Sequence, residues 1–363
     1  MKQVKHVNQA PEGADEKDLF RSDWKEDLDD DNRKKLSRVQ RNQKRNFWIP
    51  CLVVAIALGG VSLGAAYWMD HKESSNPIVQ LQKAEEKQYN DYVNWVNNLE
   101  KPADWDDETF ETLKTAALNA YSTADLEELN KAVEGDAQAA AKFEGQTEAK
   151  VQEPIKQYED LFNNASSYPA NIVALAKDPG LVAFVLEYPN HANDSGTDVT
   201  LGDVTQQMPD LKTFDQAWGY VPYRDSIMAI SGGAPTVIAD VFSYCLDDPT
   251  ITPLSIARWA KEAGYENNEV SEAEDSIFSG AALTYGVPMI PLALYKTQIT
   301  DHVSQGYPTI IVTGSYEAPK YYAIDSVDAN GQWVAYDPTT SASPVTLDPD
   351  TTIDTVIKAY SFW

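Results

Sequence analysis

The chain has 363 residues, with 29 Lys and Arg against 56 Asp and Glu, which gives a formal net charge of −27. Nucleic acid and anionic lipid headgroups are disfavoured as partners, because an acidic surface repels them. The two cysteines, Cys51 and Cys245, fall in an apolar run and in a predicted buried helix, so no disulfide framework is expected.

The N-terminal residues predict a membrane anchor. Residues 47–69 contain no charged side chain, and at about 1.5 Å per residue they form a helix long enough to cross a bilayer. Lys and Arg crowd residues 33–45, so the positive-inside rule places residues 1–46 in the cytoplasm as a disordered tail. A cleaved signal peptide, with small residues at Gly64-Ala65-Ala66, is the alternative. We expect a single-pass protein of the cell membrane with an extracellular C-terminal part.

Residues 74–165 have the apolar spacing of amphipathic helices. The first predicted helix ends before Pro102, and Ser122 to Asp125 predicts a capping box at the start of the third. The segment is either an extracellular stalk, serving as an interaction platform, or a small helical bundle without a partner. The sequence leaves both alternatives open.

From Tyr168 onward, Pro-Gly breaks, aromatic residues and β-branched runs predict a different kind of structure. Thr309 to Thr313 is a buried-strand run. Residues 320–327 and 332–336 flank Asp328-Ala329-Asn330-Gly331, and an Asn-Gly turn between alternating runs predicts a hairpin. Helices predicted over 235–246, 253–264 and 274–285 precede these strands. Helices followed by an antiparallel sheet indicate an α+β fold.

Several motifs follow one another in a fixed order in this part of the chain. They are Leu211-Lys212-Thr213-Phe214-Asp215, Ala217-Trp218-Gly219-Tyr220, Ser231-Gly232-Gly233-Ala234-Pro235-Thr236, Pro319-Lys320-Tyr321 and Tyr336-Asp337-Pro338. Together they resemble the bacterial cell-surface branch of papain-like cysteine peptidases, which is related to the peptidases that process double-glycine bacteriocin leaders. The resemblance covers residues 168–363 and implies a papain-like fold with helices packed on an antiparallel sheet.

Matched position by position, the resemblance implies that the catalytic residues are lost. Gly233 stands where the family has its nucleophilic cysteine, and Lys320 or a neighbour stands where it has the histidine base. Thr213 replaces the oxyanion glutamine, and Asp337 alone retains the carboxylate that orients the base. A carboxylate cannot perform acyl transfer without a thiolate and an imidazole. No intact catalytic site is therefore expected.

Other chemistry has little support in the residues. The histidines are His6, His71, His191 and His302, and none falls near the base position. Ser231 with Lys320 is the one hydrolytic pair left, and it requires a desolvated lysine. Cys245 lies about three helical turns after the glycine turn, too far to act as the nucleophile. There is no metal-ligand motif and no phosphate-binding loop, so the sequence predicts neither a metal nor a cofactor.

Aromatic residues near the glycine turn are candidates to line the former catalytic cleft. They are Trp218, Tyr220 and Tyr321, together with Ser231. In such a cleft they would bind a peptide or a glycan.

Three functions remain open. The first is a membrane-anchored extracellular pseudopeptidase that binds a peptide, a cell-wall component or a partner protein. The second is an active peptidase or murein-type hydrolase with a rebuilt site of Ser231 and Lys320. The third is a structural surface protein that assembles through residues 74–165. An exported domain without disulfides favours a Gram-positive cell surface.

Overall fold

The computed structural model describes residues 76–191, 194–266 and 276–363. The chain divides into two units, Met1–Asn76 and Pro77–Trp363, and the described residues belong almost wholly to the second. The predicted cytoplasmic tail and the predicted membrane helix over 47–69 lie outside the described residues. Within the described ranges, no helix combines the length and the apolar character that a membrane span requires.

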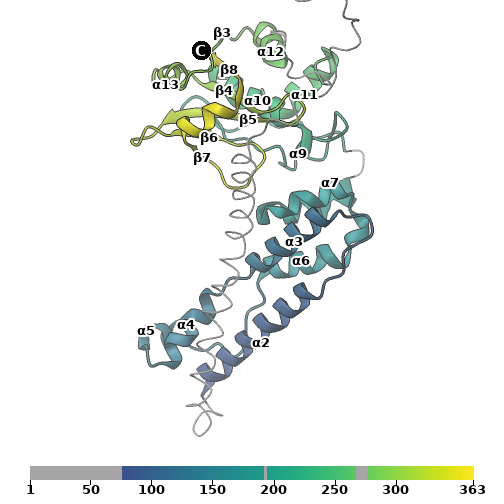
Figure 1. The fold of residues 1–363 in the computed structure, drawn as a ribbon, viewed down its shortest axis with the longest axis vertical. Helices are drawn as coiled ribbons and strands as arrows, with labels where there is room; N and C mark the ends of the chain where they lie inside the picture. The colour runs from purple at the N-terminus through teal and green to yellow at the C-terminus, as the bar shows by residue number, and fades with distance from the viewer. Residues whose placement is uncertain (1–75, 192–193, 267–275) are drawn as a thin grey trace, which may run out of the picture. The chain divides into compact units, whose positions relative to one another are not determined.

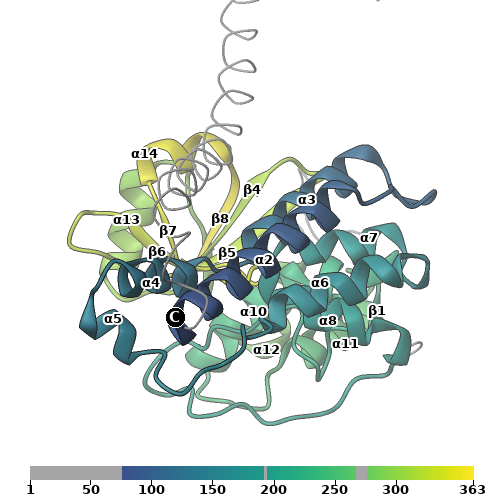
Figure 2. The ribbon, with the colours of Figure 1, turned by 90° about the horizontal axis from the view of Figure 1, so that it is seen from below.

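The N-terminal part of the second unit is helical (Figure 1). Its first helices are α2 (Pro77–Asn97), α3 (Asp107–Ala120), α4 (Ala124–Val133), α5 (Ala137–Ala141) and α6 (Glu153–Asn163). Short helices follow, namely η1 (Ala165–Ser167), α7 (Ala170–Val173), η2 (Ala174–Lys177), η3 (Pro179–Leu181), α8 (Val182–Glu187) and η4 (Tyr188–His191). Helix α3 contacts both α2 and α6, and Figure 2 shows the three lying next to one another.

The predicted capping box at Ser122 is wrong. The N-cap of α4 is Thr123, whose side chain makes no capping hydrogen bond. Because the helix starts one residue later, its third position is Leu126, which is buried. A leucine side chain cannot accept the hydrogen bond from the N-cap backbone N–H that completes a capping box. Ser122 Oγ instead accepts a long bond of 3.4 Å from the Ala124 backbone N–H.

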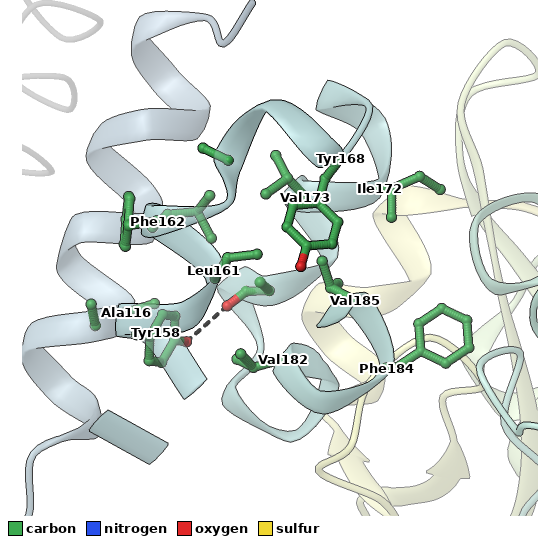
Figure 3. Packing of buried hydrophobic residues seen from close by; sticks show 14 of the residues in the cluster. Ala116, Tyr158, Leu161, Phe162, Tyr168, Ile172, Val173, Val182, Phe184 and Val185 are labelled. Atoms are coloured by element: carbon green, nitrogen blue, oxygen red, sulfur yellow. Dashed lines mark hydrogen bonds between the residues drawn. The ribbon is translucent and has the colours of Figure 1, made fainter. Parts of the chain in front are cut away.

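The helices enclose an apolar core in which residues from the short helices pack against the long ones (Figure 3). Tyr158 is fully buried, and its hydroxyl donates a hydrogen bond of 2.8 Å to the Ala176 carbonyl, so the phenol loses no hydrogen bond on burial. Tyr220, Ile227 and Ala229 belong to the same core. The helical part therefore shares one hydrophobic cluster with the segment that holds these three residues, whereas the C-terminal sheet packs in clusters of its own.

The C-terminal part contains a six-stranded antiparallel sheet with the order β3-β8-β4-β5-β6-β7. The strands are β3 (Met289–Pro291), β4 (Thr309–Gly314), β5 (Pro319–Val327), β6 (Trp333–Tyr336), β7 (Val345–Leu347) and β8 (Val356–Phe362). A small ladder pairs β1 (Pro222–Tyr223) with β2 (Ser226–Ile227). The remaining helices are α9 (Met228–Ser231), α10 (Gly233–Cys245), α11 (Pro253–Glu262), α12 (Ile277–Tyr285), α13 (Lys296–Ser304), α14 (Pro349–Thr352) and η5 (Ile353–Thr355).

Both faces of this sheet are covered. Alternate residues of a strand point to opposite faces, and in β4 Ile310 and Val312 pack with α10 whereas Ile311 packs with Ile299 of α13. Helix α10 is buried along nearly its whole length, because it lies between the sheet and other helices. The α+β class predicted from the sequence is confirmed by this mixture of helices and antiparallel strands.

The predicted hairpin is confirmed as well. Strands β5 and β6 pair antiparallel with Val327 opposite Trp333. Gly331 takes a φ of +79°, which a residue with a Cβ adopts only with strain. The Asp328 carboxylate accepts hydrogen bonds from the backbone N–H groups of Asn330 and Gln332 and so closes the turn.

Candidate functional site

The glycine turn leads directly into the central helix of the sheet domain. Helix α9 ends at Ser231, Gly232 is the N-cap, and α10 begins at Gly233. The Thr236 hydroxyl and backbone N–H both donate to the Gly232 carbonyl, which fixes the first turn of α10. Pro235 is tolerated there because the first backbone N–H groups of a helix have no partner within it. The glycine turn is therefore the N-terminus of a buried helix, and no side chain projects from its first residue, Gly233.

Gly233 is covered by an aromatic ring. A Cβ built on Gly233 would lie 2.6 Å from Cδ2 and 3.3 Å from Cε2 of Tyr321. Contacts under 3.0 Å are too short for a real Cβ, so any side chain here requires Tyr321 to move. Tyr321 is 7% exposed and packs in the core between α10 and the sheet. The volume that a nucleophile side chain needs is thus occupied.

Lys320 belongs to the other face of β5. Tyr321 and Ala323 pack with α10, whereas Tyr322 and Ile324 pack in the cluster that includes α13. Strand alternation puts Lys320 on the same side as Tyr322, and its side chain is exposed. The residue that faces Gly233 from this strand is therefore Tyr321, the neighbour of the predicted base position.

Thr213 is fully buried and joins two distant segments. Its hydroxyl lies 3.1 Å from the carbonyl oxygens of both Ala229 and Pro338, and its backbone N–H donates 2.9 Å to the Pro338 carbonyl. A hydroxyl has a single proton to donate, and here two carbonyl groups compete for it. Thr213 therefore has a structural role between α9 and the end of β6.

The carboxylate of Asp337 is part of a local turn. Its Oδ1 accepts hydrogen bonds from the backbone N–H and the hydroxyl of Thr339, at 2.8 and 2.7 Å. The Asp337 carbonyl accepts from Nζ of Lys212, whose ammonium also pairs with Asp210. Among the predicted site residues, the structure thus brings the segment of Thr213 next to the segment of Asp337. It also brings Gly233 next to Tyr321.

The other aromatic candidates lie in separate places. Trp218 is buried, and its indole N–H donates 2.7 Å to the Lys212 carbonyl. Tyr220 is buried between two rings, with Phe184 on one side at 4.1 Å between ring centroids and His191 on the other at 4.0 Å. Ser231 is partly buried at the end of α9. Trp218, Tyr220 and Tyr321 thus pack in three different hydrophobic clusters.

The sequence reasoning missed one buried ionisable group, Asp240 of α10. Its Oδ1 accepts 2.9 Å from the Leu211 backbone N–H, while its Oδ2 is buried without a hydrogen-bond partner. Burial raises the pKa of the Asp240 carboxyl well above its usual range. A polar residue flanked by apolar ones in a buried helix was the only signal in the sequence.

Cys245 is not a reactive thiol. Burial, with a smaller effect of Asp247, raises the pKa of Cys245 to about 12, so the thiolate is scarce at neutral pH. Across residues 76–191, 194–266 and 276–363, no group of three or more His, Cys, Asp or Glu is placed to hold a metal ion.

Comparison with known proteins gives little further information. No protein-family model matches the chain, and no curated protein matches it. Among solved structures, the chain is similar to the peptidase domain of Streptococcus ComA, a bifunctional ABC transporter involved in a quorum-sensing pathway. The similarity has 17% sequence identity and a TM-score of 0.29, and it covers 36% of this chain and 90% of that domain. We draw no conclusion about fold or function from a similarity of this size.

Proposed function

We propose that this protein is a single-pass, membrane-anchored surface protein whose papain-like domain binds a ligand without cleaving it. The ligand class is a peptide, a cell-wall component or a partner protein, as the motifs in residues 168–363 imply. Residues 47–69 supply the anchor, and the acidic part that follows lies outside the cell.

The contact between Tyr321 and Gly233 is the observation that supports this proposal most directly. Covalent catalysis needs a nucleophile and a base within about 2.6–3.2 Å of the proton to be moved. Gly233 has no side chain, and the Tyr321 ring occupies the volume beside it.

The rebuilt pair of Ser231 and Lys320 lacks the environment that it would need. A lysine becomes a base at neutral pH only when it is desolvated, and Lys320 is exposed. Its side of β5 is also opposite to the side that contacts α10. These facts favour binding over hydrolysis.

Hydrolysis and binding assays on the full-length protein in detergent or nanodiscs test the proposal. We expect no cleavage of peptide or muropeptide libraries, and no difference between the wild type and Ser231→Ala. We also expect retention of the wild type on isolated cell walls or on a defined envelope fraction. Cleavage that disappears in Ser231→Ala would overturn the proposal in favour of a serine hydrolase.

A further inference from the structure

A solvent-connected pocket lies where the helical part meets the β1–β2 ladder. Its volume is about 410 Å³, within the range of small-molecule sites. The lining residues include neither Gly233 nor Tyr321, so the pocket is separate from the degenerate nucleophile turn. The floor is made by buried residues, namely Ile172, Tyr220 and Ile227.

One wall of the pocket is a histidine whose position is fixed by two neighbours. The His191 ring stacks on Tyr220 with an angle of 5° between the planes, and its Nδ1 lies 3.0 Å from Oδ2 of Asp194. Hydrogen bonds from the Gly196 backbone and from His191 lower the pKa of Asp194. An ionised carboxylate only accepts hydrogen bonds, so Nδ1 of His191 donates and its Nε2 is left for a ligand.

The opposite wall carries a pair of polar groups that are already joined. The Asn171 amide donates 3.0 Å to Oγ of Ser226, which links α7 to β2 across 55 residues of sequence. This bond uses one amide proton, so the Asn171 carbonyl oxygen still accepts and the Ser226 hydroxyl still donates. Asp225 adds a carboxylate at the exposed rim.

These groups define the chemistry of a ligand. The pocket is lined by both donors and acceptors, and the rings of Tyr188 and Pro222 add apolar surfaces. The hydroxyl groups of a sugar each donate and accept, and a pyranose ring presents apolar C–H faces to such surfaces. An anion is disfavoured by Asp225 and by the net charge of −27. A purely apolar ligand would leave the polar groups unpaired.

We propose that this pocket binds a neutral or N-acetylated sugar of one or two rings. The inference rests on the proposed function for its extracellular setting and narrows the ligand of that function to a glycan. Apart from Tyr220, the residues that line this pocket lie outside the motifs that carry the family resemblance.

Calorimetry with the full-length protein and N-acetylglucosamine di- and trisaccharides tests this site, with glucose and galactose disaccharides in parallel. We expect the wild type to bind at least one of these sugars. Asp225→Ala and Asn171→Ala are each expected to weaken binding about tenfold or more, because each removes polar contacts to the ligand. Asp354→Ala is the matched control, since Asp354 is an exposed aspartate that does not line the pocket, and it should bind as the wild type does.

A second variant protects the test against a folding defect. His191→Phe preserves a flat ring for Tyr220 but removes Nε2, so it should fold and lose affinity. No binding of any of these sugars to a folded wild type, or equal binding by all pocket variants, would overturn the inference. Either result leaves the non-catalytic proposal standing, which fails only if the protein hydrolyses peptide or muropeptide or shows no retention on the envelope fractions.

Discussion

Adding a single methyl group at Gly233 tests whether Tyr321 fills the nucleophile position. In Gly233→Ala the new Cβ would lie 2.6 Å from Cδ2 of Tyr321. Both residues are buried, so the ring can move only by disturbing the packing between α10 and the sheet. The variant is therefore expected to be less stable than the wild type.

The size of the effect follows from two opposing contributions. Overpacking a filled core costs about 1–3 kcal/mol. Replacing glycine by alanine inside a helix increases the free energy of unfolding by up to about 1 kcal/mol, and by less at the first residue of α10. The free energy of unfolding should therefore fall by about 1–2 kcal/mol. A cysteine at this position is larger and should cost more.

A double-mutant cycle with Tyr321→Ala separates the clash from other effects of the alanine. Urea unfolding of the full-length protein, followed by circular dichroism, gives the four free energies. Without the ring only the helix contribution remains, so Gly233→Ala should be neutral or up to about 1 kcal/mol more stable, and the coupling energy is the overpacking cost alone, about 1–3 kcal/mol. Gly202→Ala is the matched control, because nothing lies within 4 Å of a Cβ at that position.

Two results would refute this reasoning. If Gly233→Ala is as stable as the wild type, the volume beside Gly233 is open. If it is equally destabilised with and without the Tyr321 ring, the cost comes from the backbone and not from the ring. Should Tyr321→Ala fail to fold, Tyr321→Val provides the same comparison with a smaller cavity.

Three further predictions concern polar side chains that make hydrogen bonds inside the protein. Burial raises the pKa of Asp240 in the folded state, so the protonated carboxyl contributes its full stability below about pH 3.8 and this contribution is lost as the pH rises through the folded-state pKa. In urea unfolding, the free energy of unfolding of Asp240→Asn should therefore rise relative to that of the wild type from pH 4 to pH 8. A difference between the two free energies that does not change with pH would contradict this. Tyr158→Phe removes the hydrogen bond to the Ala176 carbonyl and should lower the free energy of unfolding by about 1–2 kcal/mol, so an unchanged urea midpoint would count against the bond. Asp178→Ala removes the acceptor for the backbone N–H and hydroxyl of Ser341, and limited proteolysis should then cut near residue 341 faster than in the wild type.

Local signals in the sequence predicted the β5–β6 hairpin correctly but misplaced the start of α4. The Asn-Gly turn predicted the β5–β6 hairpin because type of turn and strand alternation are encoded within about fifteen residues. The capping box at Ser122 failed for a local reason too, because the helix started one residue later and placed Leu126 where a polar partner was needed. A shift of one residue is within the usual uncertainty of helix ends.

The candidate site depended on contacts between distant segments. The motifs correctly marked the glycine turn as the start of a helix, but they could not tell whether Lys320 or Tyr321 faces it. That choice is set by the register of β5 against β4 and β6, since a slip of one residue exchanges the two faces of a strand. Of the pocket around Asn171 and Ser226 the sequence marked only Tyr220, because the walls come from segments 55 residues apart.

The sequence by itself determined which chemical groups are present: a glycine at position 233, no histidine between Tyr316 and Ser326, and an acidic chain with one long uncharged apolar run. Only the tertiary structure decided what lies beside Gly233, by packing the Tyr321 ring onto it and directing Lys320 to solvent. The physical reason is that the type of a residue decides which chemical groups it carries. Which side chain fills the volume beside Gly233 depends instead on contacts that form only when the sheet packs against α10.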